Sequence, residues 1–327
     1  MEITNLLGKE IKTGKPVFLR NLLLFPLTNG NDQIENVTGI DDLLGRRLCQ
    51  ILELDPPVID RVNVNNTSDQ RLLVIDGEEI LGAMQNRIAA SSCFIETKSR
   101  LQVPTICVEQ GRWEADRPDS SFFSGHSVSY PFLRAALARS SVKPAGPGAR
   151  RGPEDRQDVV WDEIERKLST TKVSSFTSSM HDIYEKLNDD ISRYLHDCVS
   201  GREDARSIDE ACGLVACAST HCLALDLFGS VTLFKMFKEK LLRSYALDAI
   251  EYRNEPTPIP RQLPGRIFAD LNRAEKKKSK PEGLGIKYLM PGKTYLGQAL
   301  VCIDRGGQEQ LLHLSAFPNR KPTHEIE

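Results

Sequence analysis

The amino-acid sequence predicts an α+β protein with an antiparallel, strand-rich N-terminal half, helices in the middle and C-terminal strands that return to the sheet. Three observations support this prediction. Short β-rich runs separated by polar turns fill the chain as far as Trp113, apolar residues recur at helical spacing in the middle, and a Gly-Gly pair separates two strand-like runs near the C-terminus. The length of 327 residues allows one large domain or two ordinary ones, and we expect a single intertwined domain over 1–327.

The N-terminal half is predicted to consist of strands around one helix. Strand-like runs occupy 15–28, 58–66, 71–79, 88–96 and 101–109. A helix is expected within 40–52, because apolar residues at helical spacing follow Thr38 and Asp41, which resemble a capping box. The four short strands from 58 onwards suggest an antiparallel sheet or sandwich.

The second half is predicted to place helices before and after a hairpin. The expected helices cover 130–139, 159–168, 180–195 and 234–245, the third starting after a Ser178-Ser179 cap. Between the last two, the apolar segment 213–230 has the pattern of a hairpin of two buried strands. Another hairpin is expected within 295–317, with its turn at Gly306-Gly307.

Two segments lack the apolar residues that a core needs. Residues 140–156 hold three prolines and three glycines, which predicts a flexible surface insert. Residues 254–283 are rich in proline and lysine and are expected to form a loop.

The bulk composition excludes several classes of protein. A net charge of -2 gives no general attraction to nucleic acid or to an anionic membrane, so no specific nucleic acid partner is predicted. The longest apolar runs are too short to span a bilayer, and the start of the chain lacks the basic and apolar runs of a secretion signal. Eight cysteines in such a chain are expected to be reduced thiols, which favours a cytoplasmic location. The oligomeric state stays open.

Two short stretches mix charged and amide residues into otherwise strand-like sequence. They are GEEILGAMQNR at 77–87 and CVEQGRW at 107–113. Their polar residues suit a phosphate- or carboxylate-bearing ligand, because arginine binds anionic oxygens and amides read hydroxyls or base edges. The candidate ligand-binding residues are Gln85, Asn86, Arg87, Arg112 and Trp113, with the two arginines on phosphates and the tryptophan stacked on a ring.

Carboxylates in the same stretches are candidates for a catalytic or metal-binding role. Glu79 and Glu109 are candidates for acid–base catalysis or for binding a divalent metal. Glu78 is adjacent to Glu79 on the chain, so only one of the two is expected to face the site. The alternative is a buried Arg–Glu network that ties two strands together. The ligand site predicts that Arg87→Ala or Glu109→Gln abolishes binding with a modest loss of stability, whereas the network predicts unfolding.

The two stretches also resemble a known family. Together with PLT after an early strand, QDVVWDEI and the terminal LLHLSAF, they are similar to a bacterial domain family named for its association with ADP-ribosylglycohydrolases and the rhodanese-phosphatase superfamily. The resemblance covers about 20–317 and implies a genomic association with ADP-ribose and NAD metabolism rather than a particular reaction. It carries over the motif residues Glu78, Glu79, Gln85, Asn86, Arg87, Glu109, Arg112 and Trp113, with Gln157, Trp161 and His313 in weaker motifs.

Histidine and cysteine give further candidates. His313 would be a general base or metal ligand if its strand face looks onto the polar cluster, and otherwise a half-exposed strand histidine. Cys107 could be a nucleophile, although burial in a strand is the more common role. Cys212, Cys217 and Cys222 are not spaced as zinc ligands and are expected in a buried hairpin.

The leading hypothesis is a protein that binds a nucleotide-like small molecule related to ADP-ribose or NAD. Hydrolysis of a phosphoanhydride or glycosidic bond is the reaction class that its carboxylates suit, with Glu79, Glu109 and His313 as the catalytic candidates. The alternative is a non-enzymatic sensor or scaffold in an ADP-ribose or stress system, favoured by the lack of a nucleophile elbow or phosphate loop. A cysteine-dependent enzyme centred on Cys107 is a third hypothesis.

Overall fold

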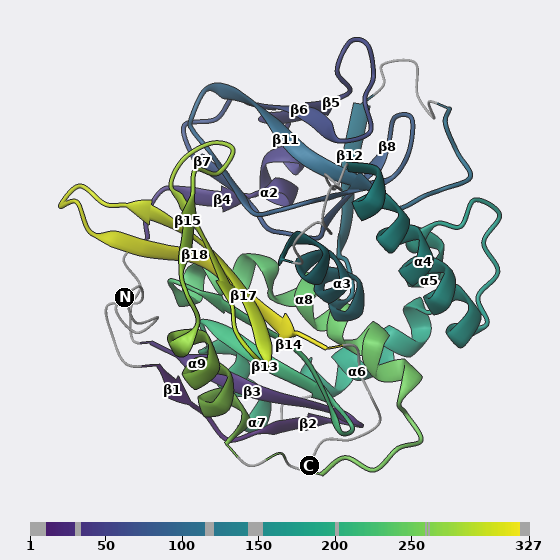
Figure 1. The fold of residues 1–327 in the computed structure, drawn as a ribbon, viewed down its shortest axis with the longest axis vertical. Coiled ribbons are helices and arrows are strands. Elements are labelled where there is room, and N and C mark those ends of the chain that lie inside the picture. The colour runs from purple at the N-terminus through teal and green to yellow at the C-terminus, as the bar shows by residue number, and fades with distance from the viewer. Residues whose placement is uncertain are drawn as a thin grey trace, which may run out of the picture. The chain divides into compact units, whose positions relative to one another are not determined.

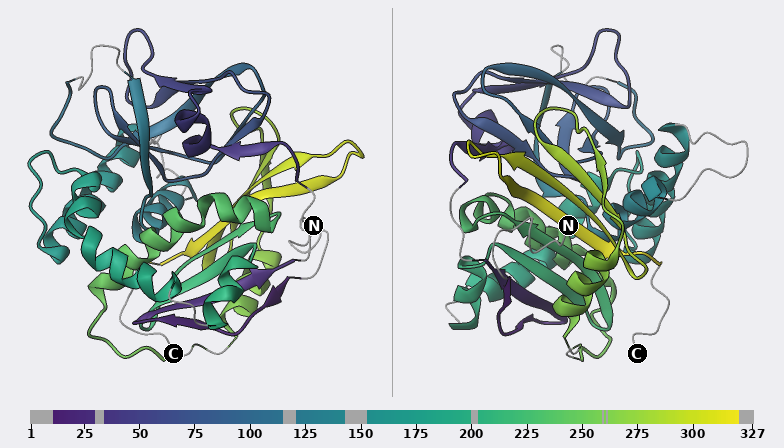
Figure 2. Two further views of the ribbon diagram at one scale, coloured as in Figure 1. Left: turned by 180° about the vertical axis from the view of Figure 1, so that it is seen from behind. Right: turned by 60° about the vertical axis from the view of Figure 1, so that its left-hand side comes forward.

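The computed structural model confirms the α+β class and divides the chain into two compact units (Figures 1 and 2). The described residues are 11–29, 34–114, 121–142, 153–199, 203–258, 260 and 262–320. Unit 1 combines 1–35, 189–281 and 285–327, and unit 2 comprises 36–188 with 282–284. The expectation of one intertwined domain stays a prediction, although the chain does leave unit 1 and return to it.

Unit 1 is built on an antiparallel sheet. Its strands are β1 (Lys12–Thr13), β2 (Val17–Leu19), β3 (Leu22–Thr28), β13 (Gly213–Ala218), β14 (His221–Phe228), β15 (Lys277–Ser279), β16 (Ile286–Pro291), β17 (Tyr295–Ile303) and β18 (Glu309–Pro318). They run in the order β1-β3-β13-β14-β18-β17-β16-β15, with β2 also paired to β3. The expected hairpins β13–β14 and β17–β18 are confirmed, and the C-terminal strands do return to a sheet that begins at the N-terminus.

Helices cover both faces of this sheet. Unit 1 holds most of α6 (Asn188–Val199), with α7 (Glu203–Asp209), α8 (Val231–Glu251) and α9 (Leu263–Arg273). The apolar side of α9 packs on one face of the sheet. Strand residues such as Phe25, Val215 and Leu227 point to this face and share a core cluster with α9. The opposite face carries Phe228, whose ring stacks on Phe237 of α8, so the two helices cover opposite faces.

Unit 2 contains a closed barrel in place of the expected antiparallel sheet or sandwich. Its strands β5 (Cys49–Leu52), β6 (Arg61–Asn66), β8 (Glu78–Gly82), β9 (Arg87–Ala89), β11 (Ser99–Cys107) and β12 (Ser121–Val128) close in the order β11-β6-β5-β12-β8-β9. A second sheet has the order β10-β7-β4, from β4 (Val37–Gly39), β7 (Arg71–Val74) and β10 (Cys93–Ile95). The helices are α2 (Ile40–Gly45), α3 (Pro131–Val142), α4 (Pro153–Thr171) and α5 (Met180–Lys186).

Apolar side chains on the inner face of each strand fill the barrel. Ile51, Val62, Ile80, Val103 and Phe122 come from different strands and share one buried cluster. Because side chains of a strand alternate between its faces, residues two positions from these also point inward. Arg87 is two residues from Ala89 of the same cluster and therefore enters the barrel.

Several predicted elements differ from the structure. The runs expected as single strands at 15–28, 71–79 and 88–96 are each divided, into β2 and β3, β7 and β8, and β9 and β10. The helix expected over 40–52 stops at Gly45, because Arg47 takes φ 58 and Cys49–Leu52 continues as β5. Gly39 is the N-cap residue of this helix and makes no side-chain hydrogen bond to it, so the predicted capping box at Thr38 and Asp41 is wrong. The helix over 180–195 breaks at Leu187 into α5 and α6.

Of the two segments predicted without core residues, one can be compared with the structure only at its ends. The insert at 140–156 lies mostly outside the described residues, between the end of α3 and the start of α4. The loop expected at 254–283 contains α9 and β15, because Leu263, Ile267 and Leu271 give α9 an apolar stripe that packs on the sheet.

Gly229, between β14 and α8, offers a test of the packing of unit 1. A Cβ at this position would lie 1.9 Å from the backbone oxygen of Leu311, which cannot move without disturbing β18. We expect Gly229→Ala to lower the free energy of unfolding by about 1–3 kcal/mol or more, as overpacking does. Urea unfolding followed by circular dichroism measures this.

Gly265 is the matched control, because it lies in α9 with nothing within 4 Å of its Cβ position. Gly265→Ala should leave stability unchanged or raise it by about 0.5–1 kcal/mol through helix propensity. Equal stability of the two variants would contradict the packing at Gly229.

Candidate functional site

Three segments of unit 2 meet where the two polar motifs lie. They are the β8–β9 connection, the turn after β11 and the start of α5. The Val108 N–H donates to the Asn86 carbonyl at 2.9 Å, which joins the first two. The Gly111 N–H donates to Thr177 at 2.8 Å and the Met180 N–H to Val108 at 2.9 Å, which join the turn to α5. The motifs are therefore hydrogen-bonded neighbours.

The carboxylate of Glu109 is the centre of this junction. One oxygen accepts from Arg112 at 2.7 and 2.9 Å and from the Asn86 N–H at 3.0 Å. The other accepts from the Thr177 hydroxyl at 3.0 Å. Burial alone would raise the pKa of Glu109, but the bonds from Arg112, Asn86 and Thr177 together outweigh it and lower the pKa. Glu109 is thus held as an anion.

Arg112 is fully occupied by this network. Besides Glu109, its N–H groups reach Asn86 Oδ1 at 3.1 Å and the carbonyls of Ala83 and Glu114 at 2.9 and 2.8 Å. A guanidinium has five N–H donors, and all of them have partners here. The phosphate contact expected of Arg112 would need some of these bonds to break.

An extended strand would have put Glu109 and Arg112 on opposite faces. The chain instead turns after Val108, with Gly111 packed against Thr177, so close that a Cβ on the glycine would lie 2.9 Å from the Thr177 Cα. The turn brings Arg112 back onto Glu109. This pairing was not foreseen from strand alternation.

The amides of the first motif also serve the junction. Gln85 donates to the Glu109 carbonyl at 2.9 Å, and its buried Oε1 has no hydrogen-bond partner. Asn86 Oδ1 accepts from the Gly82 N–H at 3.0 Å, and its Nδ2 lies 3.5 Å from the Ser179 hydroxyl. Ser179 is also the N-cap of α5, so Asn86 contacts the start of that helix.

Glu79 forms a second cluster with Ser127 and His181. The fully buried carboxylate accepts from the Ser127 hydroxyl at 2.5 Å, and the same oxygen lies 3.3 Å from His181 Nδ1. Its other oxygen is buried without a hydrogen-bond partner. Ser127 lies on β12, which pairs with β8 (Figure 1), and Gly125 leaves room for the carboxylate. His181 lies in the first turn of α5.

His181 connects this buried carboxylate with solvent. Its side chain is 25% exposed, and Nε2 lies 3.5 Å from the exposed Glu185. Burial lowers the pKa of His181, but the hydrogen bond and charge of Glu79, helped by Glu185 and Asp182, outweigh this and raise it above 6.5. A carboxylate that orients an imidazole in this way is a common arrangement for proton transfer.

Arg87 lies apart from both clusters, inside the barrel. It forms an ion pair with Glu53 at 2.7 Å, with the two side chains 0% and 3% exposed. It also donates to the Val58 carbonyl at 2.9 Å and lies over the Phe122 ring. Burial lowers its pKa, opposed by the charge of Glu53. Its phosphate contact would need this ion pair to break.

Two aromatic side chains near the junction are exposed. Trp113 is 49% exposed and Phe176 is 103% exposed. Both lie within two residues of the hydrogen bond between Gly111 and Thr177, so their chain segments are neighbours. Exposed aromatics of this kind can stack on a planar ring.

The remaining candidates lie in buried, structural surroundings. Gln157 of α4 forms two hydrogen bonds with the Cys107 backbone, at 3.0 and 2.7 Å. Burial raises the pKa of the Cys107 thiol to about 11, which leaves about one thiolate in ten thousand at neutral pH and argues against a cysteine nucleophile. Glu78 accepts from the Ile75 N–H at 3.1 Å, and Trp161 is half-buried on α4.

His313 belongs to unit 1. Its Nε2 lies 3.0 Å from Asp226, which also accepts from the Tyr245 hydroxyl at 2.6 Å. The imidazole stacks on Phe228 at 4.6 Å and is 1% exposed. The predicted half-exposed histidine is therefore wrong, because α8 covers this face of the sheet. A catalytic role for His313 stays a prediction.

The sequence interpretation missed Glu53, Ser127, Thr177 and His181. They lie in segments without a recognisable motif, and only the capping serine before α5 gave a signal near one of them. Within the described ranges, no group of three or more His, Cys, Asp or Glu residues is placed to hold a metal ion. No helix in the same ranges is long and apolar enough to cross a membrane.

These features define an α+β protein whose barrel unit carries a buried network of carboxylates and amides beside a half-buried histidine. The chain belongs to the ARPP-1 family, the ARG and Rhodanese-Phosphatase-superfamily-associated Protein domain, whose model matches residues 10–317. The resemblance seen in the sequence is thereby confirmed. Searches of curated proteins and of solved structures found no match.

The Arg87–Glu53 pair should respond to mutation as a structural element. Arg87→Met leaves a buried carboxylate alone, so we expect a loss of about 3–5 kcal/mol in the free energy of unfolding. The double variant Arg87→Met with Glu53→Leu should recover most of this loss. Urea unfolding at neutral pH measures both.

Arg46, in an exposed pair with Asp42, provides the control, and Arg46→Met should cost at most about 1 kcal/mol. An Arg87→Met protein as stable as the wild type would contradict the structural role.

The His181–Glu79 contact predicts a pH dependence. Because the folded pKa lies above 6.5, the contact stabilises the fold fully below about pH 6.5 and loses this contribution as pH rises through the folded value. In Glu79→Gln the pKa of His181 should fall, since burial then acts with less opposition. NMR titration of the imidazole protons measures the pKa of His181.

Glu185→Gln, at an exposed carboxylate, is the control and should lower the pKa of His181 by less. An unaltered pKa of His181 in Glu79→Gln would refute the contact.

Proposed function

We propose that the protein binds a nucleotide-like ligand of the ADP-ribose or NAD type at unit 2 and hydrolyses a phosphoanhydride or glycosidic bond in it. The observation that carries the proposal is the buried Glu79 carboxylate, with one oxygen bonded to Ser127 and His181 and the other without a partner. Leaving a buried acceptor unpaired costs about 1–3 kcal/mol, which a folded protein rarely retains without use.

His181 is the group that would transfer protons in this proposal. Glu79 fixes the Nδ1 side of the ring, and Nε2 points towards the exposed Glu185. An imidazole so oriented can take a proton from an attacking water and return it to the leaving group. The Ser127 hydroxyl donates its hydrogen bond to Glu79, so in this proposal Ser127 supports the carboxylate and water is the nucleophile.

Trp113 and Phe176 would bind the ring of the ligand. Their exposure, beside a junction whose backbone is fixed by hydrogen bonds, suits stacking, which contributes about 1–3 kcal/mol per base. Arg87 and Arg112 act in this proposal as supports for the barrel and for the junction. Family membership supports the ligand class through its association with ARG and rhodanese-phosphatase proteins.

A non-enzymatic sensor or scaffold is the second candidate. It is favoured by the Glu109–Arg112 pair, because every side-chain N–H and carboxylate oxygen of the pair already has a hydrogen-bond partner within the protein. In this candidate the exposed aromatics bind a ligand or partner without turnover.

Proton NMR time courses with ADP-ribose, NAD and ADP, with and without Mg²⁺ or Mn²⁺, would test the proposal. We expect line broadening followed by new product resonances. AMP with ribose 5-phosphate would identify the phosphoanhydride bond of ADP-ribose, and nicotinamide with ADP-ribose the glycosidic bond of NAD. Broadening without products would favour the sensor, and unchanged spectra for all ligands would refute binding of this class.

Variants separate the roles within the proposed site. Glu79→Gln should lower turnover by at least about 10²-fold with binding retained, as loss of acid–base catalysis does. Trp113→Ala should instead weaken binding by about tenfold or more. Glu165→Gln and Phe18→Ala remove an exposed carboxylate and an exposed aromatic elsewhere and should change neither value.

A further inference from the structure

Two cysteines lie opposite each other in the β13–β14 hairpin of unit 1. Cys217 on β13 pairs in register with Cys222 on β14, next to the pair that closes the turn at Ser219 and Thr220. Residues directly opposite each other in an antiparallel pair have Cα atoms about 4.5–5.5 Å apart. Disulfide-bonded cysteines span about 4.4–6.8 Å between their Cα atoms, so the register alone gives this pair the spacing that a disulfide needs.

The two side chains also point the same way. Both belong to the core cluster on the face of the sheet that α9 covers. The thiols of Cys217 and Cys222 share a hydrogen bond, and this bond together with burial raises the pKa of Cys217. The two sulfur atoms are therefore neighbours, and a bond between them would need only a small movement of either strand.

Other cysteines of known register lie opposite residues of other types. Cys49, Cys93, Cys107 and Cys302 pair with Asn66, Val74, Arg87 and Gln310. Cys212 precedes β13, and its thiol donates to the Leu27 carbonyl at 3.3 Å. Among the strands that the structure describes, Cys217 and Cys222 are thus the cysteines that register brings together.

Cys222 is the member of the pair that solvent can reach. It is 9% exposed, whereas Cys217 is 1% exposed and lies on a strand paired on both sides, with Leu23 of β3 opposite it on the other side. The ladder between β14 and β18 covers Leu225–Phe228, so Cys222 lies beyond its end. An oxidant would therefore meet Cys222 first, with Cys217 behind it as the second thiol.

We propose that Cys217 and Cys222 form a reversible disulfide when the protein meets a hydroperoxide. The Cys222 sulfur attacks the terminal peroxide oxygen, the O–O bond breaks, and the leaving oxygen takes up the Cys222 thiol proton. The Cys217 sulfur then attacks the resulting sulfenic acid, which forms the S–S bond and releases water that carries the Cys217 proton. Two thiols are oxidised and one peroxide is reduced. This modification site goes beyond the function proposed for unit 2.

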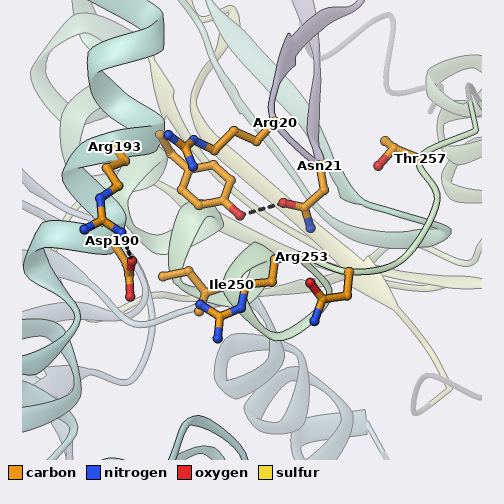
Figure 3. Close-up of a pocket in the computed structure, with 9 residues that line it drawn as sticks. Arg20, Asn21, Asp190, Arg193, Ile250, Arg253 and Thr257 are labelled. Carbon is orange, nitrogen blue, oxygen red and sulfur yellow. Dashed lines mark hydrogen bonds and ion pairs between the residues drawn. The ribbon is translucent and has the colours of Figure 1, made fainter.

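The hairpin turn links the pair to a polar pocket of unit 1. The Ser219 N–H donates to the Asn21 carbonyl at 3.0 Å. Asn21 lines a pocket of about 470 Å³ together with Tyr194, whose hydroxyl donates to the Asn21 side chain at 2.5 Å (Figure 3). An S–S bond of about 2 Å is shorter than any contact between thiols, so its formation draws the strands together beside this turn. We expect oxidation to change the surroundings of Tyr194.

Mass spectrometry of the full chain after treatment with hydrogen peroxide tests the proposal. The remaining thiols are alkylated with N-ethylmaleimide in denaturant. Trypsin cleaves after Arg206 and Lys235, so one peptide carries all three cysteines of this region. We expect a single maleimide on this peptide, on Cys212, and a further loss of about 2 Da for the two hydrogens removed. Dithiothreitol before alkylation should restore three maleimides. Since burial keeps thiolate scarce, the reaction should take minutes to hours.

Variants separate the roles of the two cysteines. In Cys217→Ala no second thiol attacks the sulfenic acid on Cys222, so dimedone should trap it there. In Cys222→Ala, labelling of the buried Cys217 should be at least about tenfold slower. Cys302→Ala is the control, because Cys302 is another buried cysteine of unit 1, 7% exposed, and its loss should leave the rate of disulfide formation unchanged.

Three results would overturn the proposal. They are three maleimides on the peptide under conditions that fully oxidise free cysteine, an internal disulfide that includes Cys212, and disulfide-linked dimers in place of the internal bond. The wild-type protein answers all three, so a variant that fails to fold leaves the test intact. NMR of the tyrosine rings tests the link to the pocket, and an unchanged Tyr194 signal in the oxidised protein would refute it.

Discussion

The buried carboxylate of Glu109 is the constraint on which the polar site of unit 2 depends. A charged group removed from water must find hydrogen-bond donors within the protein, and the chain supplies four, from Arg112, Asn86 and Thr177. These donors come from three segments that are far apart in sequence. Satisfying one anion therefore fixes the β8–β9 connection, the turn after β11 and the approach to α5 together.

The placement of α5 then decides where His181 meets the buried Glu79. Backbone bonds from Met180 and Gly111 hold its start against the turn that carries Glu109, and Ser179 caps it. His181 follows within the first turn and reaches Glu79 on β8. The two clusters thus differ. Both carboxylate oxygens of Glu109 have hydrogen-bond partners, whereas Glu79 retains an unpaired oxygen beside a histidine that is 25% exposed.

Unit 1 separates its polar groups in the same way. Asp226 with His313 and Tyr245 forms a satisfied network beneath α8, closed to solvent. The arginines around Tyr194 instead border an open pocket. In unit 1 the satisfied network maintains the fold, whereas the arginines that border the pocket are exposed to solvent.

The sequence by itself determined the α+β class, the two confirmed hairpins and the polar character of the two motifs, because apolar periodicity and turn residues act locally. It could not show that Arg87 enters a barrel, since this depends on strand closure. Nor could it show that Arg112 turns back onto Glu109, since the chain leaves the strand after Cys107. His181 and Glu79 are 102 positions apart. Only the tertiary structure could decide their contact, because it follows from the packing of α5 and not from any local preference of either residue.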